Sequence, residues 1–473
     1  MSLDKAPLAG QQAAATEAHD ETDGTRAGVS TRRVSSAFIF WCSLGALANV
    51  PFLGIQELPQ LFVGILGLVQ AVRAYWTSGG QRITAPGMYM VASGLFIFFP
   101  AIYLFFDDPI LHGRVDYVAA VNIAYWSQLG LFYFFWQQKD ARRNKVRPIS
   151  DRRVTHWGMF AGGLLVIIGL LLVNSPLAQF GFDDGASFAG IALLAVSSFR
   201  REARLTVWAY LLVIAAFLIY MQFVFAGFGR LQIGALGITI AAAAAHRWRG
   251  RAVKLALLAS FPPVLSYLAA SRVAFSGSLN PNQSASVTGL ESAIGPFVRF
   301  AELIHLDSVN EITHTGVHTF YAAAVALIPR QIWPTKPIGF GAELGDFFRP
   351  DLLGRGHSEA ALFQGEWVFA FGALIGLGLF IPVLGLMVAW LDKAAFRASR
   401  IAGSSRLEVL EMTALLILSA SITDLIWGGS FTYVSRVGPR LICLFAVFLV
   451  FGWHVTRAQG YERLRRNARK TTL

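Results

Sequence analysis

Long apolar runs recur along almost the whole chain, and they constrain the fold more than any other feature. Most are near the roughly 20 residues that a helix needs to cross a bilayer, and the two shorter ones can borrow flanking residues or thin the bilayer locally. Of the 473 residues, 55% are hydrophobic and only 14% charged, which is too apolar for a soluble domain. We therefore predict an all-α polytopic membrane protein with about 12 transmembrane helices. The predicted spans are 34–55, 58–76, 86–106, 116–136, 154–173, 186–199, 205–226, 231–246, 253–271, 366–391, 407–427 and 437–456.

The distribution of Lys and Arg predicts the orientation of these spans. If the N-terminus is cytoplasmic, 30 of the 40 basic residues fall on the cytoplasmic side, and both termini are then cytoplasmic by the positive-inside rule. The net charge of +12 therefore reflects membrane orientation, and we expect no nucleic-acid partner. The predicted divisions are a disordered cytoplasmic tail at 1–33, nine helices at 34–271, a large periplasmic loop at 272–365, three helices at 366–456, and a basic cytoplasmic tail at 457–473.

The loop at 272–365 is too long to be a simple connection, and loops of this length usually carry function or structure. Its segment GLESAIGPFVRFAELIHL has apolar residues at helical spacing, which indicates an amphipathic helix that lies on the outer leaflet or covers the spans. The following run, THTGVHTFYAAAVALIP, has the length of a re-entrant or interfacial helix. We therefore predict that short interfacial helices occupy this loop.

The stretch IPRQIWPTKPIGFG follows directly and carries two cations between prolines. Each proline fixes its own φ and biases the preceding residue toward extended geometry, so this backbone should be stiff. Arg330 and Lys336 would be held at the interface, where Trp333 is also suited to the headgroup level. The two cations can either bind the phosphate of a lipid carrier or anchor the loop to lipid headgroups.

The same stretch, read together with HSEAALFQGEWVFAFGALIGLG, resembles the signature of the O-antigen polymerase family, the Wzy-like oligosaccharide repeat unit polymerases. About fifty residues carry the likeness, together with the topology of the chain. The matching residues are Pro329, Arg330, Trp333, Lys336, Pro337, Ser358, Gly365, Glu366, Phe371, Gly372 and Gly376. The related O-antigen ligases use a loop histidine followed about a dozen residues later by Gly. Here Val368 stands where that Gly is expected after His357, which favours a polymerase and leaves a ligase as the alternative.

The resemblance implies a GT-C-like, metal-independent and inverting glycosyltransferase in the bacterial inner membrane. It would polymerise repeat units carried on undecaprenyl pyrophosphate at the periplasmic face, for O-antigen, capsule or exopolysaccharide, and would need no cofactor. The implied partners are these lipid-linked glycans, the bilayer and a candidate chain-length regulator protein.

Such a transfer is a displacement at an anomeric carbon, and the attacking hydroxyl must lose a proton to a His or carboxylate. Glu366 and His357 are favoured as catalytic residues because both precede the tenth span. Each could instead be a loop-surface group or a helix cap. The other candidates are Glu343, Asp346, His314 and His318. His314 and His318 could share a helical face and bind a metal, but no nearby carboxylate completes that spacing, so no metal site is predicted.

The leaving pyrophosphate needs cations, because negative charge grows on it in the transition state. The predicted pyrophosphate-binding residues are Arg330, Lys336, Arg230, Arg272, Arg436 and Arg440. Asp424 could pair with Arg440 across the last outer loop, and a buried ion pair between helices is as good a reading of that pair as substrate binding.

Two further features bear on function. The pairs Asp107–Asp108 and Asp183–Asp184 are interpreted as turn and helix-start residues, because Asp before Pro or Gly commonly forms turns. Both cysteines lie in apolar runs, so neither a disulfide framework nor a thiolate metal site is expected.

A flippase or ion-coupled transporter is the competing class. Such a protein would need ionisable residues in the membrane and broken helices, whereas the predicted span centres are nearly free of charge.

Overall fold

The computed structural model describes residues 36–50, 56–107, 116–136, 152–199, 206–225, 230–245, 250–275, 291–352, 358–401 and 405–452. Within these ranges the regular secondary structure is helical and contains no strand. Besides the helix Ser36–Ala48, the α-helices are α2 (Leu58–Thr77), α3 (Ala85–Ser93), α4 (Phe99–Asp107), α5 (Tyr117–Gly130), α6 (Arg152–Leu172), α7 (Phe182–Phe199), α8 (Thr206–Ile219), α9 (Arg230–Ala245), α10 (Gly250–Phe275), α11 (Glu291–Ser308), α12 (His318–Ala324), α13 (Phe340–Phe348), α14 (Leu362–Ile401), α15 (Arg406–Ala420) and α16 (Ile422–Val447). Short π-helical segments extend or join several of them: η1 (Gly94–Phe98), η3 (Leu131–Trp136), η5 (Tyr220–Val224) and η7 (Phe448–Gly452).

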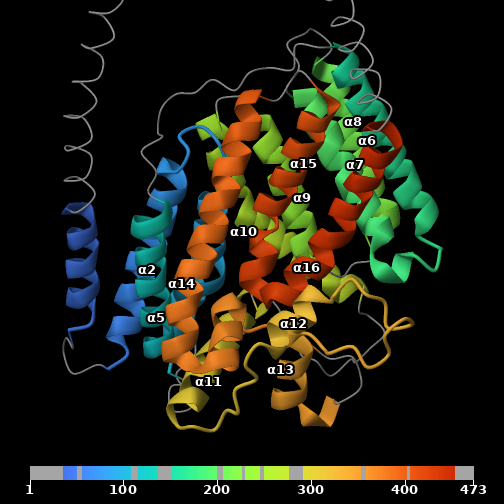
Figure 1. Cartoon of the computed structure of the whole chain (residues 1–473). Coiled ribbons are helices and arrows are strands. Elements are labelled where there is room, and N and C mark those ends of the chain that lie inside the picture. Colours follow the sequence, from blue (N-terminus) through green and yellow to red (C-terminus); the bar gives the residue numbers. More distant parts are fainter. Residues whose placement is uncertain are drawn as a thin grey trace, which may run out of the picture.

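The long helices form one bundle, and the shorter α11, α12 and α13 gather at its lower end in Figure 1. In the described ranges, eight helices are long and apolar enough to cross a membrane, which supports a membrane-embedded protein. The prediction of twelve spans and that of a GT-C fold are not confirmed. Two predicted spans correspond to the shorter helices Ser36–Ala48 and Leu231–Ala245. The predicted span 407–427 is divided, because α15 ends at Ala420 and α16 begins at Ile422.

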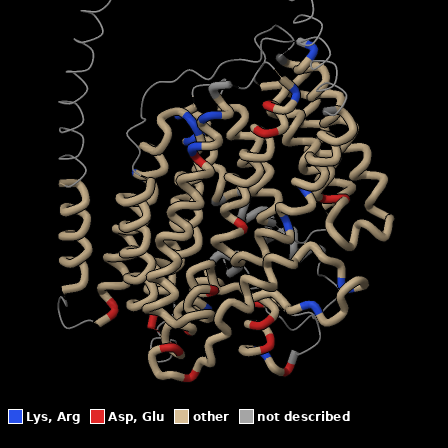
Figure 2. The backbone as a smooth tube through the Cα atoms, in the orientation of Figure 1, with Lys and Arg blue, Asp and Glu red and all other residues tan. Residues whose placement is uncertain are grey.

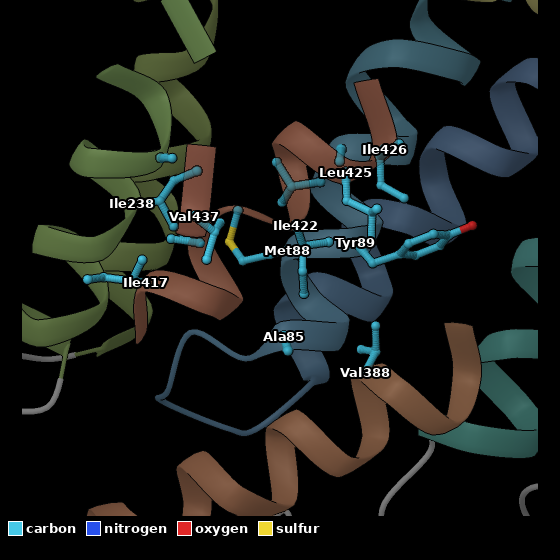
Figure 3. Close-up of a cluster of buried hydrophobic side chains, with 14 of the residues drawn as sticks. Ala85, Met88, Tyr89, Ile238, Val388, Ile417, Ile422, Leu425, Ile426 and Val437 are labelled. Atoms are coloured by element: carbon cyan, nitrogen blue, oxygen red, sulfur yellow. The ribbon is translucent and has the colours of Figure 1, made fainter. Parts of the chain in front are cut away.

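Side chains from several helices meet in a shared apolar core. Figure 3 shows residues of α3, α9, α14, α15 and α16 in contact around both halves of α16. The labelled residues are Ala85, Met88, Tyr89, Ile238, Val388, Ile417, Ile422, Leu425, Ile426 and Val437. The core therefore fixes α16 at the centre of the bundle, where α12 and α13 cover it from the lower end.

Polar side chains also join helices inside the bundle. The Gln60 amide nitrogen donates to the Ala101 carbonyl at 2.8 Å, and that of Gln128 donates to the Gln70 side chain at 3.0 Å. Hydrogen bonds between helices can replace the missing hydrophobic driving force in lipid. Helices α6 and α7 are joined instead by close packing of their backbones. A Cβ on Gly190 would lie 2.6 Å from the carbonyl oxygen of Gly162, so no side chain separates the two helices at this point.

Helix α14 folds back on itself at Gly372. This residue has φ 77° and ψ 165°, a conformation that essentially only glycine adopts. The ring centroids of Phe363 and Phe380 lie 5.6 Å apart, whereas seventeen residues of straight helix would separate them by about 25 Å. The segment 362–371 is therefore a re-entrant arm that lies against the segment 373–401.

Helix α16 has the same construction at Gly429, which has φ 78° and ψ −173°. The Tyr433 hydroxyl donates to the Leu418 carbonyl at 3.1 Å, and Arg436 Nη1 lies 2.6 Å from Asp424 Oδ1. Twelve residues of straight helix would place that Arg and Asp about 18 Å apart along the axis. The segments 422–428 and 430–447 are therefore antiparallel arms. The predicted span 366–391 missed the reversal at Gly372, because hydropathy does not change there. Gly429 lies in the outer loop predicted between the spans 407–427 and 437–456, so a reversal of the chain was predicted in that region.

Candidate functional site

A polar site lies at the tip of α16, the reversal at Gly429 and Ser430, where the carboxylate of Glu366 is bound. Glu366 lies on the re-entrant arm of α14 and is fully buried. Its Oε2 accepts from the Ser430 backbone N–H at 2.7 Å, and its Oε1 accepts from the Ser430 hydroxyl at 2.5 Å. Ser430 begins the second arm of α16, so the carboxylate satisfies an N–H at a helix N-terminus that would otherwise be unpaired.

Gly429 is required at this tip for a second reason besides its backbone conformation. A Cβ there would lie 2.7 Å from Glu366 Oε2 and 3.1 Å from the Phe340 ring. Phe340 is the first residue of α13, and Gly339 before it lies against Phe431. Arms from α14 and α16 and the start of α13 therefore meet at one point.

Glu343 stands one turn into α13 and forms the second polar contact of the site. Its Oε1 lies 2.6 Å from Nδ1 of His318, the first residue of α12. Burial raises the pKa of the Glu343 carboxyl, and the hydrogen bond from His318 opposes this shift. Glu343 is close enough to Glu366 for the two carboxyl groups to interact electrostatically. His318 itself is half exposed, with 50% of its side chain accessible.

His318 and Glu343 have the arrangement of a positioned general base. A carboxylate that accepts from Nδ1–H fixes the tautomer of the imidazole and leaves Nε2 free to take a proton. The ring is accessible, whereas the carboxylate that orients it is only 13% exposed. This pair of residues was present among the candidates from the sequence, but their partnership was not predicted, because α12 and α13 are separated by the proline-rich stretch.

Asp307 and His314 form a similar contact at the tip of α14. His314 Nε2 lies 3.2 Å from Asp307 Oδ1, and Asp307 Oδ2 accepts from the Ala373 N–H at 2.9 Å, directly after Gly372. The Gly316 N–H donates to the Ala370 carbonyl at 2.9 Å. This pair therefore holds the outer loop to the tip of α14. His314 and His318 have different carboxylate partners, and within the described ranges no three His, Cys, Asp or Glu side chains are grouped to hold a metal ion.

The two cations of the proline-rich stretch differ in their surroundings. Lys336 is buried, and its Nζ donates to the Ala326 carbonyl at 2.9 Å and to the Ile328 carbonyl at 2.8 Å. Burial and the nearby Arg330 lower the pKa of the Lys336 ammonium. Arg330 is exposed, and its Nη1 makes one long contact of 3.4 Å with the Pro334 carbonyl. Lys336 therefore closes the turn, and Arg330 is the cation that the turn presents.

Arg436 and Arg440 lie on the second arm of α16 and are both compensated by carboxylates. Arg436 Nη1 lies 2.6 Å from Asp424 Oδ1. Arg440 is fully buried over the Phe188 ring, with Nη2 3.5 Å from Asp184 Oδ2 and Nη1 3.9 Å from Asp424 Oδ2. The predicted contact between Asp424 and Arg440 is present. The contact of Arg436 with Asp424 joins the two arms of α16, and the contact of Arg440 with Asp184 joins α16 to α7, so carboxylates offset the charge of both arginines.

The proline-rich stretch runs beside this arm of α16. Leu327 lies against Gly438, which stands midway between Arg436 and Arg440, and the Gln331 side chain lies 3.5 Å from that of Gln179. The exposed Arg330 and the partly exposed Arg436 therefore belong to the same side of the bundle. Figure 2 shows many of the acidic residues at the lower end of the molecule, where α11, α12 and α13 lie.

Several predicted residues lie outside what the structure describes. His357 is not in the described ranges, and the side chains of Arg230, at the start of α9, and Arg272, in α10, are not described. Asp346 lies in α13 and is half-buried. Their predicted roles stay predictions.

The bundle holds charged groups in its interior, and a buried ion pair between Asp424 and Arg440 was one of the two alternatives from the sequence. Glu366, Asp424 and Arg440 are fully buried. The Tyr220 hydroxyl donates to Asp184, which extends the network to a further helix. The sequence placed all three residues near the ends of predicted spans, and the burial of Glu366 was not predicted because the reversal at Gly372 was not.

Comparison of the chain with protein-family models, with curated proteins and with solved structures finds no match.

Proposed function

We propose that the chain is a membrane glycosyltransferase that joins oligosaccharide repeat units carried on undecaprenyl pyrophosphate, at the periplasmic face of the bacterial inner membrane. The observation that carries this proposal is the contact between His318 and Glu343 beside the tip of α16. An oriented and accessible imidazole is the group that an acceptor hydroxyl needs. The resemblance to O-antigen polymerases supplies the substrate class.

In the proposed reaction, the acceptor hydroxyl oxygen attacks the anomeric carbon of the donor sugar. As this C–O bond forms, the bond from the anomeric carbon to the phosphate oxygen breaks, and its electron pair leaves on the diphosphate. His318 takes the hydroxyl proton at Nε2, and Glu343 stabilises the resulting imidazolium through Nδ1–H. The negative charge that grows on the diphosphate is offset by Arg330, whose guanidinium can offer a bidentate contact to phosphate.

We assign Glu366 a positioning role, although the sequence favoured it as a catalytic residue. Both of its oxygens accept hydrogen bonds from Ser430, and the residue is fully buried. Because the side chain is fully buried, a substrate hydroxyl could reach it only by displacing the residues packed around it. By joining the arms of α14 and α16, it fixes the tip of α16, and the start of α13, the helix that carries Glu343, packs against that tip.

The test is elongation of a lipid-linked repeat unit by the purified chain in vesicles, with product length read on a gel. We expect His318→Gln and Arg330→Ala each to lower turnover by about 10²-fold or more, as for removal of a general base or of one charge-stabilising group. The matched controls are His305→Gln on α11 and Arg349→Ala, whose exposed guanidinium pairs with Asp351. Equal activity in His318→Gln and His305→Gln would defeat the assignment of the base.

Two other functions remain candidates. The O-antigen ligase reaction would use the same groups, with a different acceptor. An ion-coupled transporter or flippase is favoured by one observation: both broken helices carry buried ionisable residues, Glu366 on one and Asp424 on the other. Vesicles that hold a lipid-linked glycan on one face separate the classes, because translocation without any elongation would replace our proposal by transport.

A further inference from the structure

A large apolar cavity lies between α7, α8, α9 and α10. Its volume is about 600 Å³, which is within the range of roughly 300–1,000 Å³ typical of small-molecule sites. The side chains around it are aliphatic or aromatic, including Phe199, Phe217, Ile240 and Val253, and among the described residues that line it none is charged. Gly237 of α9 also lines it, and a Cβ added there would meet nothing within 4 Å.

The cavity lies at the end of the bundle opposite to the polar site. Phe199 is the last residue of α7, and the beginning of α7 lies beside Gln179, which contacts Gln331 of the outer loop. The length of α7 separates the two ends by about 26 Å. The lining residues of α10 also come from its first two turns. The distribution of basic residues predicts that this end is cytoplasmic.

Water is a poor occupant of this space, because a buried water needs about three hydrogen-bond partners and the lining offers almost none. An empty space of this size would forfeit many dispersion contacts. The cavity borders the lipid-facing side of the bundle: Ile214 both lines it and is 53% exposed, and on the same helix Trp208 and Leu218 are exposed as well. A hydrocarbon chain can therefore enter from the bilayer.

The first turn of α10 offers a partner for the other end of such a molecule. Arg251 is exposed and directly precedes the lining residues Ala252 and Val253. The N–H groups of this turn also favour an anion. A lipid with a phosphate in its headgroup matches both the apolar space and the cation next to it.

We propose that this cavity is a specific site for a membrane phospholipid of the cytoplasmic leaflet. One acyl chain fills the space between α8, α9 and α10, and the headgroup phosphate lies at Arg251. The site is separate from the one that acts on the lipid-linked glycan, and it does not depend on the proposed glycosyltransferase function.

The test is native mass spectrometry of the purified full chain in a non-ionic detergent, after extensive washing to remove loosely bound lipid. We expect the wild type to retain one phospholipid, identified by its mass. Gly237→Leu should lower the retained fraction at least tenfold, because the new side chain occupies the cavity. Arg251→Ala should lower it severalfold through loss of the phosphate contact.

Gly234→Leu is the matched control. Gly234 lies on α9 one turn earlier, a Cβ there also meets open space, and it does not line the cavity, so this variant should retain the phospholipid. Should Gly237→Leu fail to fold, Ala241→Leu from the same lining replaces it. The proposal is overturned if the cavity variants and the control retain the same amount, if the wild type retains no phospholipid, or if the retained lipid is a polyprenyl phosphate.

Discussion

Replacing Gly429 by alanine tests the reversal in α16 and the contact that it makes with Glu366. The backbone at Gly429 has a positive φ and an extended ψ, so alanine there should cost about 1–3 kcal/mol in strain alone. The added Cβ would also lie 2.7 Å from Glu366 Oε2. That carboxylate accepts from the Ser430 N–H and hydroxyl, and losing even one charge-assisted bond costs about 1.5–3 kcal/mol. The expected total loss in the free energy of unfolding is about 2.5–6 kcal/mol.

Two other glycines of the chain provide matched controls. Gly372→Ala has nearly the same backbone strain, but its nearest neighbour is the end of the His314 side chain at 3.2 Å, which can move. It should lose only about 1–3 kcal/mol. Gly378→Ala lies in the long arm of α14 with open space around its Cβ, so it should be neutral or more stable by up to about 1 kcal/mol.

The assay is unfolding by SDS in mixed micelles, followed by tryptophan fluorescence and circular dichroism. We expect the order Gly378→Ala, then Gly372→Ala, then Gly429→Ala, from most to least stable. Adding Ser430→Ala to Gly429→Ala should cost little more, because the contact is already lost. If Gly429→Ala unfolds at the same SDS concentration as Gly378→Ala, neither the reversal nor the Glu366 contact exists as described.

The remaining predictions concern charged groups. Burial raises the pKa of Glu343 above its usual 4.5, so its contribution to stability is complete below pH 4.5 and is lost as the pH rises through the raised pKa. Glu343→Gln should therefore lose less stability than wild type as the pH rises from 4.5, and parallel SDS unfolding curves would contradict this. Lys336→Met removes two hydrogen bonds to backbone carbonyls, so the turn that carries Arg330 should open more often. Tryptic cleavage after Arg330 in open vesicles should then become severalfold faster, and an unchanged rate would show that the lysine does not hold the turn. Arg440→Met leaves Asp424 and Asp184 without this buried cation and should lower the free energy of unfolding by about 3–5 kcal/mol. Adding Asp424→Asn should restore part of that loss. A loss under about 1 kcal/mol in the single variant would refute the pairing.

The sequence predicted the helical class and the membrane character, because both depend on the length and apolar content of local segments. It did not predict how those segments end or turn. The break at Ser421 falls inside the predicted span 407–427, and the apolar segment before Gly372 is indistinguishable from the start of a span. A glycine in a predicted span is common, so only the observed φ at each position identifies the reversal.

The candidate site was predicted in its residue types and not in its pairings. His318, Glu343 and Glu366 were all among the candidates, but the partner of each depends on contacts between elements far apart in sequence. Glu366 was favoured as a catalytic residue at the start of the tenth predicted span, and it is bound to Ser430, sixty-four residues away. Nothing in the local sequence marks Ser430 as a partner, because a serine after two glycines is equally consistent with a surface turn.

The two reversals solve a problem that a polar site inside a membrane protein must meet. Backbone N–H and C=O groups cannot be left unpaired in lipid, so a break in a helix is tolerated only where other protein groups satisfy it. At Gly429 the carboxylate of Glu366 satisfies the Ser430 N–H, and at Gly372 the carboxylate of Asp307 satisfies the Ala373 N–H. Each break therefore brings an acidic side chain to its tip. Because α12 and α13 cover the first of these tips, the same contacts that permit the broken helices also fix the elements that carry His318 and Glu343.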